Sequence, residues 1–88
     1  MYSKLKICSE LIDFIAQHTD NSVIASWAFS KYHEYPESDN NNVYDQMVMK
    51  NLYTLMFTDE PEFEISRKEM IQMCIDLLNE YLQEINED

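Results

Sequence analysis

The 88-residue sequence contains no glycine and only two prolines. Glycine supplies the positive φ angles that tight β-hairpin turns need, so its absence disfavours a hairpin-rich fold and favours helices. Basic residues are also scarce: six lysines and arginines stand against 17 aspartates and glutamates, for a formal net charge of −11. Because phosphate binding needs a positive face, this balance argues against nucleic acid as a direct ligand and against an anionic membrane surface.

Long hydrophobic runs are absent as well. No stretch approaches the roughly 20 apolar residues of a membrane span, and Ser9, Glu10 and Asp13 interrupt the N-terminal apolar positions, so we expect no signal peptide. The two cysteines, Cys8 and Cys74, fall on apolar helical faces without the spacing of metal ligands. We expect them to be buried free thiols in a reducing cytoplasm rather than a disulfide.

Apolar residues are nevertheless abundant, with 45% hydrophobic and 12% aromatic residues, so the chain is expected to fold despite its charge. At this length, residues 1–88 form one domain with one modest core. Apolar residues recur at three- and four-residue spacing, which predicts helices over about 3–18, 22–35, 42–57 and 66–85. The expected fold is all-α, an irregular four-helix bundle.

The segment SVIASWAFSKYHEY, residues 22–35, is apolar around most of its helical circumference. Such a helix is expected at the centre of the fold. It carries the only tryptophan, Trp27, which we expect to be buried. Ser22 is the predicted N-cap.

The last helix has a clear start signal. Ser66 and Glu69 have the spacing of a capping box, and Ile65 and Met70 occupy the two positions of a hydrophobic staple. The helix is therefore predicted to begin at Ser66. Arg67, in its first turn, opposes the helix dipole, and we expect nearby acids to compensate it.

No residues with the spacing of a metal site or catalytic centre are evident. Asp39, Asn41 and Asp45 loosely resemble a calcium loop, but Tyr44 and Lys50 stand where such a loop needs glycine and a bidentate acid. We therefore predict no metal, no cofactor and no catalytic residues.

The two histidines and the paired acids also have ordinary structural explanations. His18 and His33 lie at predicted helix ends, where histidines commonly cap carbonyls. Glu60 and Glu62 lie in an exposed loop, where solvated charge is expected rather than a carboxyl group with a raised pKa. The protein is predicted not to be an enzyme.

Acidic residues concentrate between Glu34 and Glu64, with Lys50 as the one base among them. Aromatic residues lie among these acids, a composition expected of a surface that docks a basic partner. If the two loops involved share one side of the bundle, they form one binding surface. The candidate partner-binding residues are Glu34, Tyr35, Glu37, Asp39, Tyr44, Asp45, Asp59, Glu60, Glu62, Phe63 and Glu64.

The order of segments resembles small bacterial immunity proteins. The resemblance covers an S-x-x-x-x-W-A element, a polar loop, a helix ending near an acidic D-x-P turn, and a last amphipathic helix. The matching residues are Ser22, Trp27, Ala28, Asp59 and Pro61, followed by the helix from Ser66. The pattern is similar to immunity proteins of colicin D type and of contact-dependent growth inhibition systems.

This resemblance implies a cytoplasmic antidote that binds and neutralises a cognate toxin domain, expected to be a basic RNase or tRNase. An acidic protein could occupy the cationic groove of such a nuclease after a fast, steered encounter. The alternative is an acidic interaction module without an immunity role, an adaptor or anti-activator. A homo-oligomer is compatible with the sequence but not indicated by it.

Overall fold

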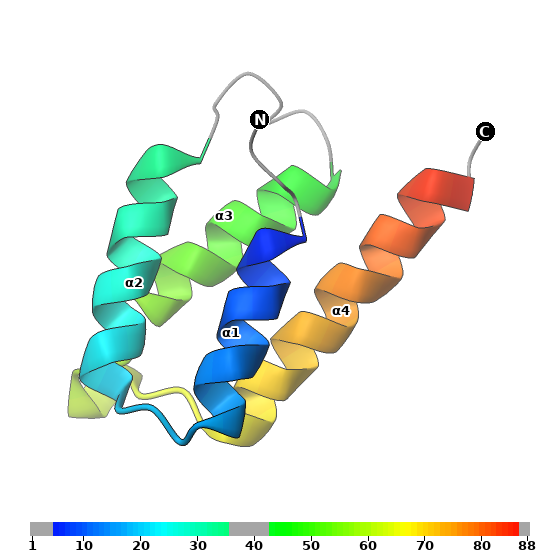
Figure 1. Cartoon of the computed structure of the whole chain (residues 1–88). Helices are drawn as coiled ribbons and strands as arrows, with labels where there is room; N and C mark the ends of the chain where they lie inside the picture. Colours follow the sequence, from blue (N-terminus) through cyan, green and yellow to red (C-terminus); the bar gives the residue numbers. More distant parts are fainter. Residues whose placement is uncertain (1–4, 36–42, 87–88) are drawn as a thin grey trace.

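The computed structural model describes residues 5–35 and 43–86, and within them the chain forms four α-helices and no strand. Figure 1 shows their arrangement. The helices are α1 (Lys6–Ala16), α2 (Asn21–Glu34), α3 (Val43–Leu55) and α4 (Arg67–Asn86), with a short 3₁₀ helix η2 (Pro61–Phe63) between α3 and α4. The predicted all-α four-helix bundle is confirmed.

The helices pack as a ring of neighbours. α3 packs between α2 and α4, and α1 packs mainly against α4 and also contacts α2. One hydrophobic core lies inside this ring and draws on every α-helix. Its fully buried side chains include Ile7, Leu11, Ile24, Ala28, Val48, Leu52, Leu55, Met70 and Leu77.

The prediction that residues 22–35 form the central helix is wrong. α2 buries only Ile24, Ala25 and Ala28, whereas α3 contributes five buried residues. Val23 and Phe29 are 49% and 55% exposed on the outer side of α2. The small Ala25 and Ala28 are thus buried together with Ile24, while the larger Val23 and Phe29 lie on the surface. An apolar circumference therefore did not distinguish a central helix from one with an exposed apolar face.

Trp27 is partly buried at the edge of the core rather than inside it. Its ring lies edge-on against Phe14 of α1, with the ring centroids 5.3 Å apart. Its indole N–H donates a hydrogen bond to the carboxylate of Glu10. The polar end of this half-buried ring therefore has an acceptor, which comes from the neighbouring helix α1.

α1 ends in a Schellman motif with a histidine where glycine is usual. The N–H groups of His18 and Thr19 donate to the carbonyls of Ile15 and Phe14 over 3.2 and 3.0 Å. His18 has a φ angle of 55°, in the left-handed region. His18 thus lies at the helix end as predicted, and it closes that end through its backbone N–H and left-handed conformation.

The N-cap of α2 lies two residues before the predicted one. Its N-cap is Asp20, whose carbonyl accepts hydrogen bonds from the N–H groups of Val23 and Ile24. No side-chain cap bond is made there, so the prediction of Ser22 as N-cap is wrong. At the other end of this helix, His33 lies in the last turn with its ring edge-on against Phe29, and the ring centroids are 4.4 Å apart.

α4 begins directly after Ser66, as the capping signal predicted. The N–H of Glu69 donates to the Ser66 hydroxyl oxygen over 3.1 Å, and the hydroxyl in turn faces the Glu69 carboxylate. We had expected upstream acids to compensate Arg67, but within residues 5–35 and 43–86 no ion pair joins Arg67 to an acid. Its guanidinium donates to the backbone carbonyl of Thr19, which ties the first turn of α4 to the α1–α2 connection.

Cys8 and Cys74 are free and buried, as predicted. Burial raises the pKa of the Cys74 thiol to about 11. It also raises the pKa of Cys8, although a hydrogen bond with Tyr44 works in the opposite direction. Both thiols are therefore held in their protonated, unreactive form at neutral pH.

Candidate functional site

A pocket of about 580 Å³ opens where α3 ends and the chain turns through η2 toward α4. Aromatic rings and glutamates dominate its lining, and the described residues that line it include no lysine, arginine or histidine. We call it the aromatic pocket. It is lined by Tyr53, Thr54, Phe57, Glu60, Glu62, Phe63, Glu64 and Ile65.

The aromatic walls of this pocket belong to a continuous row of rings. Tyr53 and Phe57 are four residues apart on one face of α3, and their ring centroids lie 5.3 Å apart at 72°. The ring centroid of Phe63 in η2 lies 6.2 Å from that of Phe57. The ring centroid of Tyr32 in α2 lies 5.9 Å from that of Tyr53. Tyr53 and Phe63 are each 54% exposed. The row therefore presents aromatic faces to solvent as well as stabilising the surface between α2 and η2.

Backbone and side-chain hydrogen bonds hold the turn that carries Phe63. Pro61 starts η2, where its fixed φ suits a helical first turn, and the Phe63 N–H donates to the Glu60 carbonyl over 2.9 Å. Thr58 is buried, and its hydroxyl oxygen accepts the Ile65 N–H over 2.9 Å. Thr58 thus closes the loop at its base and places Phe63 beside Phe57.

The rim of the pocket is acidic. Glu60, Glu62 and Glu64 are exposed around the aromatic walls. Asp59 lies next to them, in a neighbouring hollow between α2 and the end of α3. Four predicted binding residues, Glu60, Glu62, Glu64 and Phe63, thus line one pocket, and a fifth adjoins it.

Three other predicted binding residues are core residues, so their expected place on the surface is wrong. Tyr35, Tyr44 and Asp45 are only 5%, 1% and 0% exposed. The Tyr35 hydroxyl donates to Asp45, whose position in the first turn of α3 favours a negative charge. Tyr44 packs edge-on against Tyr81 at 5.7 Å. Polar partners inside the bundle explain why these residues are buried.

Glu34 does not belong to the same surface. It ends α2 and forms a 3.7 Å ion pair with Lys31. Because α2 and α3 are antiparallel, the end of α2 and the loop after α3 lie at opposite ends of that pair (Figure 1). The sequence left open whether the two acidic stretches share one surface, and Glu34 does not lie on the surface of the later stretch. Glu37 and Asp39 lie outside the described residues.

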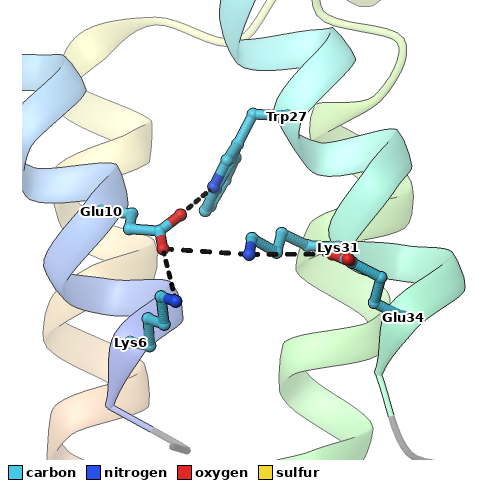
Figure 2. A network of polar contacts seen from close by, with 5 residues as sticks. All are labelled: Lys6, Glu10, Trp27, Lys31 and Glu34. Atoms are coloured by element: carbon cyan, nitrogen blue, oxygen red, sulfur yellow. Dashed lines mark hydrogen bonds and ion pairs between the residues drawn. The ribbon is translucent and has the colours of Figure 1, made fainter. Parts of the chain in front are cut away.

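A second polar cluster joins α1 to α2 (Figure 2). One oxygen of the Glu10 carboxylate lies 3.8 Å from the Lys6 ammonium and 3.9 Å from that of Lys31, and the other accepts the Trp27 N–H. The positive charges of the two lysines are thereby balanced by the negative charges of Glu10 and Glu34. The cluster stabilises helix packing and leaves no concentrated charge for a ligand.

The pocket offers binding groups rather than an activated nucleophile. The hydroxyl of Thr54 donates to the Lys50 carbonyl of its own helix over 3.0 Å. In residues 5–35 and 43–86, no cluster of three or more histidine, cysteine, aspartate or glutamate side chains could hold a metal. Within the same ranges, no helix has the length and apolar character that a bilayer crossing requires.

Sequence reasoning missed Tyr53, Phe57 and Thr58. A signal existed for the two aromatic residues, because a four-residue spacing places them on one side of the third helix near its end. The role of Thr58 had no such signal, since its hydrogen bond to Ile65 spans seven residues of irregular chain.

No protein-family model, curated protein or solved structure matches this chain. The function must therefore be argued from the geometry and charge of the aromatic pocket.

Proposed function

We propose that this protein is an immunity protein that binds a basic toxin domain in the cytoplasm and neutralises it. The observation that supports this proposal is the aromatic pocket, which combines exposed rings with three glutamates and has no basic residue among the described residues of its lining. That combination is selective for a cationic protein surface.

The pocket suits a lysine or arginine side chain of the partner. The face of an aromatic ring attracts a cation within about 6 Å of its centroid, by about 0.5–2 kcal/mol. Tyr53, Phe57 and Phe63 provide such faces, and the rim glutamates provide acceptors for an ammonium or guanidinium group. An arginine gains most, because its planar group both stacks on rings and binds carboxylates in a bidentate manner.

The charge of the whole chain supports the same partner class. A net charge of −11 attracts a cationic protein over long distances and accelerates the encounter. A nuclease must be cationic around its active site because its substrate is a polyanion. An acidic protein docked there excludes the substrate by occupying its place.

A non-immunity adaptor or anti-activator would use the same surface to mask a different basic protein. Biological context separates the two functions, since only an immunity protein rescues cells from a toxin. The direct test expresses the toxin domain encoded beside this protein in its genome, with and without the protein, and measures growth.

Matched variants make the test specific to the pocket. Glu60→Lys/Glu62→Lys changes the net charge by +4 at the rim, and Asp76→Lys/Glu80→Lys makes the same change on the outer face of α4. We expect the wild type and the α4 variant to protect and the rim variant to lose protection, with circular dichroism showing all three folded.

Protection by the rim variant equal to that of the wild type would refute the pocket mechanism. Failure of the wild type to protect, with measurable binding of a basic protein through the same pocket, would support the adaptor function instead.

A further inference from the structure

α4 carries two apolar stripes, and only one of them faces the core. The first is buried and contains Met70, Cys74 and Leu77, with Tyr81 packed against the core beyond them. The second is exposed, and its five side chains are each between 37% and 54% accessible. These are Ile71, Ile75, Leu78, Leu82 and Ile85.

The exposed stripe has the spacing of a helix-pairing seam. Its members alternate at four and three residues along the whole of α4, which is the repeat that brings two helices together along their length. Beside it, Ile12 and Ile15 of α1 form the far wall of a groove of about 300 Å³ with Ile71, Ile75 and Leu78. In the described part of the chain, the residues that line the groove are apolar apart from Cys74, so it can receive the side chains of an apposed helix.

We propose that the exposed stripe of α4 is the interface of a homodimer, paired with the same stripe of a second copy. A twofold axis makes one stripe complementary to itself, so no other surface is needed. This inference does not depend on the toxin-binding function.

The distribution of charge around α4 favours a second copy. At 100° per residue, the solvent side of the stripe is bordered by Gln72 and Asn79, which are uncharged. Asp76 and Glu80 lie farther around the helix, away from the seam. In a chain with a net charge of −11, this strip lets two copies meet without placing acids directly opposite each other.

The same pattern favours antiparallel pairing. Lys68 continues the stripe at the N-terminal end of α4, and its side chain is exposed. An antiparallel seam places Ile75 of one copy against Leu78 of the other and brings Lys68 near the C-terminal end of the partner's α4, where the helix dipole favours a positive charge. It also sets the two helix dipoles in opposite directions.

The response to salt separates this interface from toxin binding. Two acidic copies repel each other, so salt should screen the repulsion and strengthen the dimer, whereas it should weaken binding to a basic partner. Sedimentation equilibrium of the full chain at about 20 mM and about 500 mM salt is expected to show a dimer whose dissociation constant falls by about tenfold as salt rises.

Two matched substitutions locate the interface. Ile75→Asp places a charge in the centre of the seam and is expected to raise the dissociation constant by at least about a hundredfold. Val23→Asp makes the same change at an exposed valine of α2 and is expected to leave the dimer intact. Circular dichroism and thermal unfolding establish that both variants remain folded.

A wild-type protein that stays monomeric at 100-micromolar concentrations and both salt levels, about 20 and 500 mM, would overturn the proposal. So would a dimer that Val23→Asp disrupts as much as Ile75→Asp does. If Ile75→Asp unfolds the chain, Leu82→Lys, near the exposed end of α4, provides the same test, and a dimer unchanged by it would also refute the seam.

Discussion

The hydroxyl of Tyr35 donates a hydrogen bond to Oδ1 of Asp45, joining the residue that follows α2 to the first turn of α3. Both residues are buried. The bond connects the two ends of the segment between these helices from inside the core. Two residues that appear suited to a binding surface instead stabilise the fold.

Tyr35→Phe is expected to lower the free energy of unfolding by about 1.5–3 kcal/mol, because it removes a hydrogen bond to an acidic group in the core. Chemical denaturation monitored by circular dichroism measures the change. Tyr32→Phe is the control, since the Tyr32 hydroxyl makes no hydrogen bond within the described part of the chain, and its cost should be well under 1 kcal/mol, about the scale of a neutral surface change. Equal costs for the two variants would show that the buried bond contributes nothing.

Thr58→Val should loosen the loop that forms the aromatic pocket, because it removes the acceptor of the Ile65 N–H. The expected loss of stability is about 1–2 kcal/mol. Hydrogen exchange of the Ile65 amide should accelerate by at least tenfold, about what 1.4 kcal/mol implies. Thr54→Val is the control, since that hydroxyl bonds only an exposed carbonyl on its own helix. Unchanged protection of Ile65 would contradict the role assigned to Thr58.

His18→Gly is expected to stabilise the protein by about 1 kcal/mol, because a left-handed φ angle is costly for a residue with a Cβ atom. Thermal unfolding should show a higher melting temperature. The neighbouring Gln17 has a φ angle of −91°, so Gln17→Gly should destabilise instead. A His18→Gly protein less stable than the wild type would show that the imidazole ring contributes contacts that outweigh the strain.

The free energy of unfolding should depend on pH through the ionisation of the buried Cys74 thiol. Its pKa rises to about 11 on folding, whereas an unfolded thiol titrates near about 8.5. The unfolded chain therefore loses this proton first as pH rises. The thiol's contribution is fully present below about pH 8.5 and falls by up to about 1.4 kcal/mol per pH unit between there and about pH 11.

Cys74→Ala should remove that part of the slope, even though the cavity it leaves lowers stability at all pH values. The measurement is urea unfolding of both proteins from pH 7 to about pH 10.5. Parallel curves for the wild type and the variant would contradict the burial effect.

Local patterns in the sequence predicted much of the fold. Helix periodicity gave the four-helix architecture, and the capping box located the start of α4 at Ser66. The position of α2 was not predictable in the same way, because the small Ala25 and Ala28 are buried while the larger Val23 and Phe29 are exposed. That choice depends on the opposing helix, which periodicity does not describe.

Some residues of the candidate site were also predictable from local sequence, and others were not. The acids of the Asp59 to Glu64 loop were identified because charge and proline mark an exposed turn. Tyr35 and Asp45 were misplaced because their burial depends on each other, across ten residues of sequence. In the sequence, an acid and a tyrosine that pair in the core look the same as an acid and a tyrosine on the surface. Only the folded structure shows that the two side chains contact each other.

The kinetics of binding to the toxin domain test the central claim most directly. Association and dissociation rates should be measured at low and physiological salt for the wild type, Glu60→Lys/Glu62→Lys and Asp76→Lys/Glu80→Lys. The account predicts an association rate that falls by about tenfold or more with salt. It also predicts that the rim variant slows association far more than the α4 variant of equal charge. Association that is independent of salt, or equally slow in both variants, would contradict recognition of a basic partner by the aromatic pocket.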